Sequence, residues 1–189
     1  LRDHGAMKTD FERHHSKGSF LLTEYAHLGY NVRMTDMQGA MGVAQAAKIG
    51  KILAVKHALA AEFGERLKKI SWLRPPLTPP GYEHGYQTHC TLFRPEETLK
   101  AVAKRDLKKI NALNEQRNEI MARLESVGIA TRQGTHAVHI QKLYREKYGY
   151  KPMDFPAAYA ADKLTVALPF FVSMTEAERE YLFQQLGKF

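Results

Sequence analysis

The chain has 189 residues, which fits one domain, or a small domain with part of a second. Its hydrophobic fraction of 44% is enough for a proper core, and its net charge of +8 permits an anionic partner such as a nucleotide or a phosphorylated metabolite. No apolar run approaches the roughly 18 residues of a membrane-spanning helix. The basic residues are spread along the chain without a nucleic-acid-binding motif. We therefore expect neither a membrane nor a nucleic acid as partner.

The N-terminal stretch carries little that can be assigned. Its first five residues, LRDHG, are not a signal peptide and lack an initiator Met, so we expect the chain to begin inside a longer product. The single cysteine, Cys90, excludes an internal disulfide and fits a reducing cytoplasm. His4, His14 and His15 have no Cys or carboxylate at ligand spacing, so no metal site is expected. Residues 20–22 (FLL) are predicted to be a buried anchor or a short strand.

The most informative stretch is 29–38 (GYNVRMTDMQ), where a polar loop leads into the longest predicted helix. Thr35 can act as its N-cap, and Gln38, three residues later, can reach back to the N–H of the cap. Asn31 and Arg33 come just before and can bind a phosphate or carboxylate near the positive end of a helix. From residue types alone, a capped helix with a solvated Arg33 is the commoner explanation, because capping boxes are frequent and carry no chemistry.

Apolar residues recur every three or four positions from 36 to 70, which predicts one long amphipathic helix with a possible bend at Gly50. The Ala-rich first half would let another backbone pack closely. Prolines in 72–81 exclude a helix or a central strand, so this segment is predicted to separate two domains, 1–70 and 71–189.

Alternation in 84–93 predicts a half-buried strand with Tyr86, Thr88, Cys90 and Leu92 on one face. Residues 96–110 are charged and only weakly helical, which suggests a surface insertion. A clearer helix is expected over 114–127, and the glycine at 128 would end it.

The last third of the chain is predicted to contain short strands at 129–131 and 163–169 and a helical turn at 155–159. A second capping box, from Thr175 to Glu178, opens a final helix. The order of strands and helices predicts an α+β domain with helices against a small sheet. The final helix is expected to bury three residues: Tyr181, Leu182 and Leu186.

A second polar stretch, 132–139 (RQGTHAVH), contains His136 and His139. A surface loop explains it equally well, because two histidines three residues apart are not evidence of catalysis. The chain has no nucleophile elbow, no phosphate loop, no dinucleotide fingerprint and no Cys/His pair at metal spacing. The residues therefore predict ligand-binding loops without a recognisable reactive group.

Taken together, these motifs resemble the DegT/DnrJ/EryC1/StrS family of pyridoxal-phosphate-dependent sugar aminotransferases. The resemblance follows the family's order over nearly the whole chain except 94–112, and its most specific part is the GYNVRMTD core. It implies an α/β to α+β chain that forms the C-terminal part of an aspartate-aminotransferase-type (fold type I) enzyme, with the end of the large domain and the small domain. The motifs lie at 1–5, 24–38, 131–139, 168–169 and 174–178.

The resemblance also implies what this chain does not supply. In the family, the Schiff-base lysine and the aspartate that pairs with the pyridine nitrogen both precede the LRDHG-like motif. No lysine here matches the catalytic one, so we expect no catalytic residue within this chain. The isolated chain is therefore expected to be inactive and to bind the cofactor weakly or not at all.

Residue by residue, the resemblance implies a site shared across a homodimer. Asn31 matches the asparagine that reaches the phosphate of pyridoxal phosphate in the neighbouring subunit. Tyr30 and Arg33 match neighbours lining the same site, where Arg33 would suit a carboxylate or a substrate phosphate. His139 lies where many members have the His of a HYxPLH segment near the sugar. His136 belongs to the same stretch, whose sequence here, GTHAVH, differs from that form.

The function implied is transfer of an amino group, from glutamate as the expected donor, to a keto-sugar or a nucleotide-linked keto-sugar in the cytoplasm. The alternative is a non-catalytic dimerisation or ligand-binding module derived from the same family. The start of the natural gene product would separate the two, since a lysine-bearing region ahead of Leu1 favours the enzyme.

Overall fold

A computed structural model describes residues 26–189 of the chain. The chain divides into two compact units between Ile49 and Gly50, and each unit is considered by itself below. The expectations for the histidines at 4, 14 and 15, for the FLL segment at 20–22 and for the motif at 1–5 lie outside the described residues. The predicted division into domains 1–70 and 71–189 stays a prediction.

The first unit contains helix α2 (Asp36–Ala46), which begins at the predicted capping box. The Thr35 N–H donates to Gln38 Oε1 at 3.0 Å, and the Gln38 N–H donates to Thr35 Oγ1 at 3.3 Å. The expected single helix over 36–70 is interrupted at Ala47 and Lys48, before helix α3 (Ile49–Leu67). The last turn tightens there, with the Lys48 N–H bonded to Gln45 O, so the break comes ahead of Gly50.

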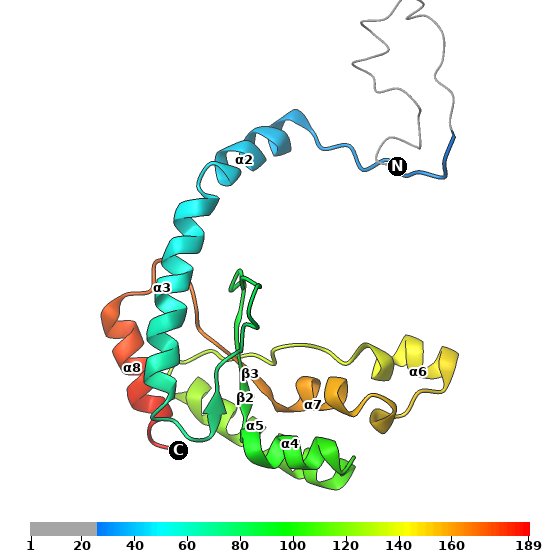
Figure 1. The fold of residues 1–189 in the computed structure, drawn as a ribbon, viewed down its shortest axis with the longest axis vertical. Helices are drawn as coiled ribbons and strands as arrows, with labels where there is room; N and C mark the ends of the chain where they lie inside the picture. Colours follow the sequence, from blue (N-terminus) through cyan, green and yellow to red (C-terminus); the bar gives the residue numbers. More distant parts are fainter. Residues whose placement is uncertain (1–25) are drawn as a thin grey trace, which may run out of the picture. The chain divides into compact units, whose positions relative to one another are not determined.

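The second unit is built on a three-stranded antiparallel sheet in the order β1-β2-β3 (Figure 1). β1 is an edge strand of only two residues, in agreement with the exclusion of a central strand from the proline-rich segment. β3 is buried at every position, so both of its faces are covered. The strands are β1 (Leu73–Arg74), β2 (His89–Phe93) and β3 (Thr165–Leu168).

Strand β2 corrects the predicted strand over 84–93 in two ways. It begins only at His89, and its more buried face carries His89, Thr91 and Phe93, while Cys90 and Leu92 are half-buried. The alternation was correct in period but assigned to the wrong face. The reason is that the rings of Phe63 and His89 pack together, with centroids 5.2 Å apart, and this contact with α3 is invisible in the local sequence.

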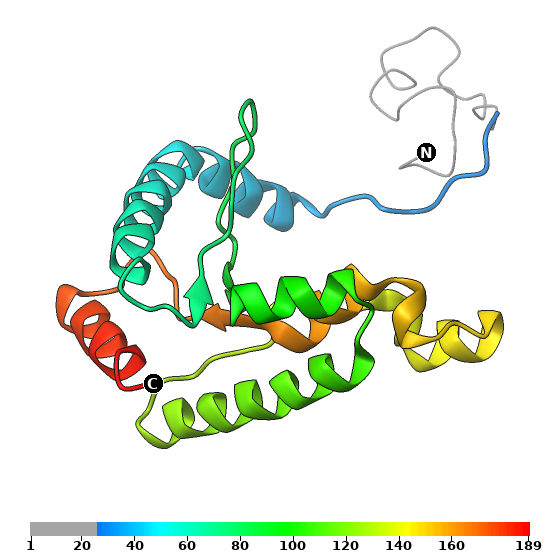
Figure 2. The same ribbon diagram turned by 60° about the horizontal axis from the view of Figure 1, so that its bottom comes forward.

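Two hydrophobic clusters hold the helices against the sheet. α3 and α8 (Glu176–Leu186) contribute to one cluster with β3, and α4 (Pro95–Ala103), α5 (Leu107–Ser126) and α7 (Pro156–Leu164) form the other with β2. Figures 1 and 2 show these two groups of helices beside the sheet. Shorter helices complete the unit: η1 (Val138–Ile140), α6 (Lys142–Tyr148) and η2 (Pro152–Asp154).

The segment 94–112 is not a surface insertion. It forms α4 and the first turns of α5, with Asp106 as N-cap of α5, so the helix expected from 114 begins at Leu107. Ala101 is 2% exposed and Ile110 is fully buried, and both pack into the second cluster. The prediction was wrong because the few apolar residues that face the core are diluted by many charged ones.

The end of the chain follows the expectations except at two points. The second capping box opens α8, and Leu182 and Leu186 are buried as predicted. Tyr181, expected to be buried, is 43% exposed, and its hydroxyl donates to Val127 O at 2.9 Å. Residues 129–131 form no strand; the neighbouring contact with the sheet is a single bridge between Arg132 and Ala167.

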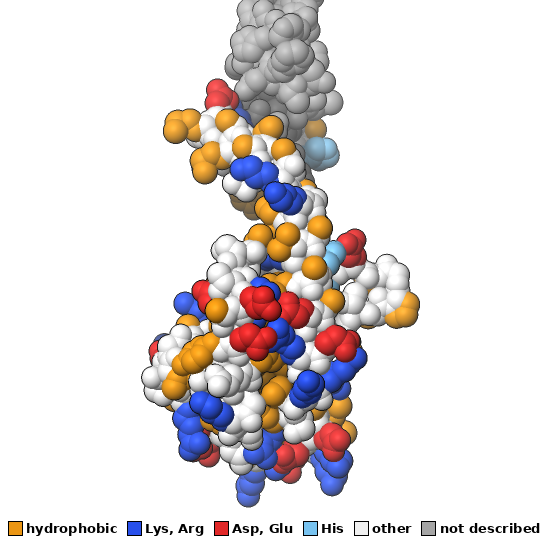
Figure 3. Space-filling view, turned by 90° about the vertical axis from the view of Figure 1, so that its left-hand side faces the viewer, with side chains coloured by type: hydrophobic (Ala, Val, Ile, Leu, Met, Phe, Trp, Pro, Cys, Tyr) orange, Lys and Arg blue, Asp and Glu red, His pale blue; other side chains and the backbone are white. Residues whose placement is uncertain are grey.

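Charges on the α3–α8 face are paired rather than gathered by sign, as Figure 3 shows for one face of this unit. Arg66 contacts Glu62 at 2.8 Å and Glu180 at 2.7 Å, and Arg179 contacts Glu62 at 3.1 Å. Hydrogen bonding to Glu180 raises the pKa of Arg66. On this face the excess of basic residues therefore does not create a continuous basic surface.

Candidate functional site

The loop ahead of α2 brings two of the predicted site residues together. Asn31 Oδ1 accepts hydrogen bonds from the Arg33 Nε at 3.2 Å and from the Arg33 N–H at 3.4 Å. Because its oxygen is used in this way, Asn31 offers its amide N–H groups as outward donors. Tyr30, in the same loop, is 70% exposed.

This loop has the donors that a phosphate requires. An amide N–H group and a guanidinium lie within three residues, just before a helix whose first turn is positively polarised. The capping box uses the side chains of Thr35 and Gln38 for the helix itself, so Asn31 and Arg33 are not needed as caps. The residues present therefore fit a phosphorylated ligand, in agreement with the chemistry inferred from the sequence.

The segment 132–139 is held against the sheet at its beginning. Arg132 and Ala167 exchange two backbone hydrogen bonds, of 3.1 and 2.7 Å. The Gly134 N–H donates to Thr165 Oγ1 at 3.1 Å. A Cβ at position 134 would lie 2.0 Å from Cys90 Sγ, so this close approach requires glycine.

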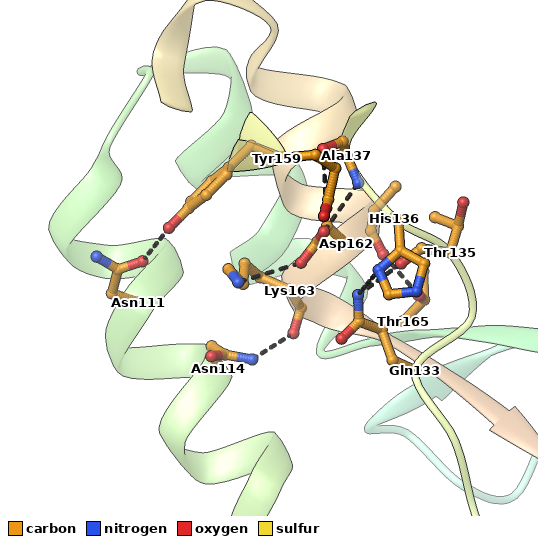
Figure 4. Close-up of polar contacts among 12 residues, drawn as sticks. Asn111, Asn114, Gln133, Thr135, His136, Ala137, Tyr159, Asp162, Lys163 and Thr165 are labelled. Carbon is orange, nitrogen blue, oxygen red and sulfur yellow. Dashed lines mark hydrogen bonds and ion pairs between the residues drawn. The ribbon is translucent and has the colours of Figure 1, made fainter. Parts of the chain in front are cut away.

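His136 is exposed and its ring is oriented by Gln133 (Figure 4). The Gln133 side-chain nitrogen lies 3.4 Å from His136 Nδ1 and donates to Thr135 O at 2.6 Å. An amide nitrogen can only donate, so this contact favours the tautomer in which Nδ1 accepts and Nε2 carries the proton. His136 can thus present a hydrogen-bond donor to a hydroxyl or phosphate oxygen.

His139 lies in a different environment. It is 7% exposed, its Nε2 lies 3.2 Å from Pro152 O, and its ring contacts Phe155 with centroids 5.1 Å apart. These contacts join the segment to η2 and to the start of α7. The two histidines therefore share one segment, but only His136 has its ring in the open.

A family model covers almost the whole chain. Residues 1–187 match the model of the DegT/DnrJ/EryC1/StrS aminotransferase family. The chain belongs to this family. The resemblance predicted from the GYNVRMTD core and the accompanying motifs is confirmed.

Family relatives with curated names and solved structures are longer than this chain. The spore coat polysaccharide biosynthesis protein SpsC of Bacillus subtilis is 27% identical over 173 residues, which are 92% of this chain and 41% of SpsC. The chain spans about two fifths of the length of such relatives.

Solved structures of the family share the fold. The putative sugar aminotransferase Spr1654 of Streptococcus pneumoniae, in its PMP-form, superposes with a TM-score of 0.75 at 18% identity, over 100% of this chain and 42% of that one. The Helicobacter pylori aminotransferase PseC, involved in pseudoaminic acid biosynthesis, gives 0.68 at 17% identity, over 99% and 43%. The expected fold, the C-terminal part of a fold type I enzyme, is confirmed.

One group of residues that contacts the 132–139 segment was missed by the sequence analysis. Asp162 of α7 is 3% exposed, and its Oδ2 accepts a hydrogen bond from the Ala137 N–H at 2.8 Å. Arg117 of α5 is 4% exposed; burial lowers the pKa of its guanidinium, and the Asp162 charge opposes that shift. The only local signal was a single carboxylate in the apolar stretch PAAYAADKL.

The remaining chemistry of the described residues is limited. Over residues 26–189, no group of three or more His, Cys, Asp or Glu side chains could hold a metal ion. Within the same residues, no helix is long and apolar enough to cross a membrane. Burial raises the pKa of the Cys90 thiol, which makes it a poor nucleophile.

Proposed function

We propose that this chain is the part of a pyridoxal-phosphate-dependent aminotransferase that anchors the cofactor phosphate and forms a wall of the substrate site. The amino group would pass from glutamate to a keto-sugar or a nucleotide-linked keto-sugar. The observation that carries the proposal is the Asn31–Arg33 pair, which offers amide donors ahead of a capped helix in a chain of this family. Solved structures of the family include PLP and PMP forms.

Each residue has a defined task in this proposal. Asn31 donates to a phosphate oxygen of the cofactor in the neighbouring subunit of a homodimer, and Arg33 fixes the Asn31 amide while adding positive charge. Tyr30, exposed beside them, lines the substrate side. When bound, the cofactor supplies the electron sink for amino transfer.

The second unit would supply residues that contact the sugar. His136 can donate from Nε2 to a sugar hydroxyl or phosphate oxygen. His139 is also assigned to the sugar side, where it fixes the course of the segment through Pro152. The reacting lysine is expected ahead of Leu1, and a cytoplasmic location fits a chain with one unpaired cysteine.

The test uses the full-length protein that contains this chain. Asn31→Ala should weaken pyridoxal phosphate binding by about 2 kcal/mol, roughly thirtyfold, because it removes a hydrogen bond to a charged group. Asn118→Ala, at an exposed position of α5, is the matched control and should leave the dissociation constant unchanged. Cofactor binding can be followed by absorbance, and amino transfer by release of 2-oxoglutarate from glutamate with a panel of UDP- and dTDP-linked keto-sugars.

Mixed dimers test the shared site directly. We expect a dimer of one Asn31→Ala subunit and one subunit lacking the Schiff-base lysine to regain one intact site, although each homodimer is defective. Without regained binding, Asn31 does not serve the neighbouring subunit. The isolated 189-residue chain should form no stoichiometric borohydride-stable adduct with pyridoxal phosphate; such an adduct on one specific lysine would contradict the proposed division of the site.

A further inference from the structure

Helix α7 carries a buried carboxylate, Asp162, on a side that is otherwise mainly apolar. Asp162 is 3% exposed in a helix otherwise composed mainly of Ala, Tyr and Leu on its buried side. Its Oδ2 accepts from the Ala137 N–H at 2.8 Å, and its Oδ1 lies 3.1 Å from Lys163 Nζ. A buried carboxylate is costly unless it is paired and hydrogen-bonded, so its main effect is expected where its hydrogen bond leads.

That hydrogen bond leads to the segment containing His136. On one side of the histidine, the Gly134 N–H donates to Thr165 Oγ1. On the other side, the Ala137 N–H donates to Asp162 Oδ2 (Figure 4). Only two residues lie between these anchors, so the backbone of His136 is fixed at both ends. Its ring remains exposed and is oriented by Gln133.

The carboxylate has two cations near it. Lys163 contacts it directly, and Arg117 lies close enough that the charge of Asp162 opposes the effect of burial on the guanidinium. Arg117 Nε has no hydrogen-bond partner among residues 26–189. An amide in place of Asp162 could still accept from Ala137, but it would leave Arg117 without its compensating charge.

We infer that Asp162 is a positioning residue for substrate recognition, which holds the 132–139 segment so that His136 meets the sugar part of the substrate in a preformed geometry. This inference rests on the proposed function. A segment fixed before binding loses little conformational entropy when the sugar binds, so its anchors contribute to sugar affinity without touching the sugar.

The experiment compares three variants of the full-length protein. Asp162→Ala removes the anchor, and Asp162→Asn keeps an acceptor for Ala137 but removes the charge. Asp106→Ala is the matched control, because Asp106 also accepts one backbone N–H, from Lys109 at 2.9 Å, but on the exposed start of α5. The two half-reactions are measured separately, with glutamate as donor and with a UDP- or dTDP-linked keto-sugar that the unmodified protein aminates as acceptor.

We expect Asp162→Ala to raise KM for the keto-sugar about tenfold. The value of kcat, and the KM for glutamate, should each stay within about twofold of the unmodified protein. Asp162→Asn should recover most of the loss in KM, and Asp106→Ala should leave both substrates unaffected. Equal losses with donor and acceptor in Asp162→Ala, or the same pattern in Asp106→Ala, would show a purely structural role and overturn the inference.

Hydrogen exchange gives a second measurement that does not depend on activity. The peptide covering 132–139 should exchange faster in Asp162→Ala than in Asp106→Ala, and an unchanged rate would overturn the inference. If the unmodified protein aminates no keto-sugar, the proposed function is wrong. The inference that Asp162 positions His136 for the sugar is then wrong too. Faster exchange would then show only that the anchor exists.

Discussion

We expect the stability of the second unit to depend on pH through His89. The side chain is 1% exposed at the start of β2, among the rings of Phe63, Tyr86 and Phe170. Its Nδ1 has no hydrogen-bond partner within residues 26–189. Burial is the main cause that lowers the pKa of His89 from 6.5 to about 4, and the nearby His84 adds to it.

The sign follows from the two protonation states. The unfolded chain binds a proton at His89 below about pH 6.5, whereas the folded chain binds it only below about pH 4. Stability from this group is therefore complete above pH 6.5 and is lost as the pH falls towards 4. The difference between the two pKa values corresponds to a total loss of roughly 3 kcal/mol in the free energy of unfolding. About 2 kcal/mol of this is lost between pH 7.5 and pH 5.

Replacement of His89 by Phe should remove this dependence. The variant keeps an aromatic ring beside Phe63 and Phe170 and has no group to protonate. The free energy of unfolding is measured with urea at pH 7.5 and at pH 5 for both proteins. Its fall between these pH values should be about 2 kcal/mol smaller in His89→Phe than in the unmodified chain. The exposed His136, changed to Gln, serves as control and should leave the difference unchanged. The same fall in both proteins would refute the assignment to His89.

Two further substitutions test local packing and capping. Gly134→Ala should lower the free energy of unfolding by about 1–3 kcal/mol, because the new Cβ would lie 2.0 Å from Cys90 Sγ. Adding Cys90→Ala to this variant should restore part of the lost stability. If the effects of the two changes simply add, the contact between positions 134 and 90 is not the cause. Thr175→Ala should lower the free energy of unfolding, measured by thermal unfolding, by about 1 kcal/mol, because it removes the side-chain cap of α8. Thr175→Ser keeps the hydroxyl and should change the stability little. Equal effects of Ala and Ser would show that the hydroxyl is not the cap.

Local rules predicted the ends of elements well. The capping boxes at Thr35 and Thr175, the glycine at 128 that ends α5 and the proline at 156 that begins α7 all depend on residues within one turn of each other. The Asn31–Arg33 contact also joins residues only two positions apart, although the sequence analysis did not predict it. Such features follow from sequence because the partner is always nearby.

The predictions that failed depended on distant partners. The buried face of β2 is selected by α3, which lies 26 residues earlier for the Phe63–His89 contact. Ile110 is buried in the same hydrophobic cluster as Leu164, although Lys108 and Lys109 directly precede it in sequence. Tyr181 is drawn outward by a hydrogen bond to Val127, 54 residues away. None of these contacts leaves a periodic trace in the local sequence.

The same distinction separates the two groups of proposed binding residues, one in each unit. α2 buries no residue, and the loop with Asn31 contains a hydrogen bond between residues two positions apart, ahead of its capped helix. The 132–139 segment instead depends on β3, η2 and α7, through contacts with Ala167, Thr165, Pro152 and Asp162. Changes around Asn31 should therefore alter ligand binding with little effect on folding. Under the proposed function, changes that release the 132–139 segment would alter substrate recognition through the fold of the second unit, so each needs a control matched for stability.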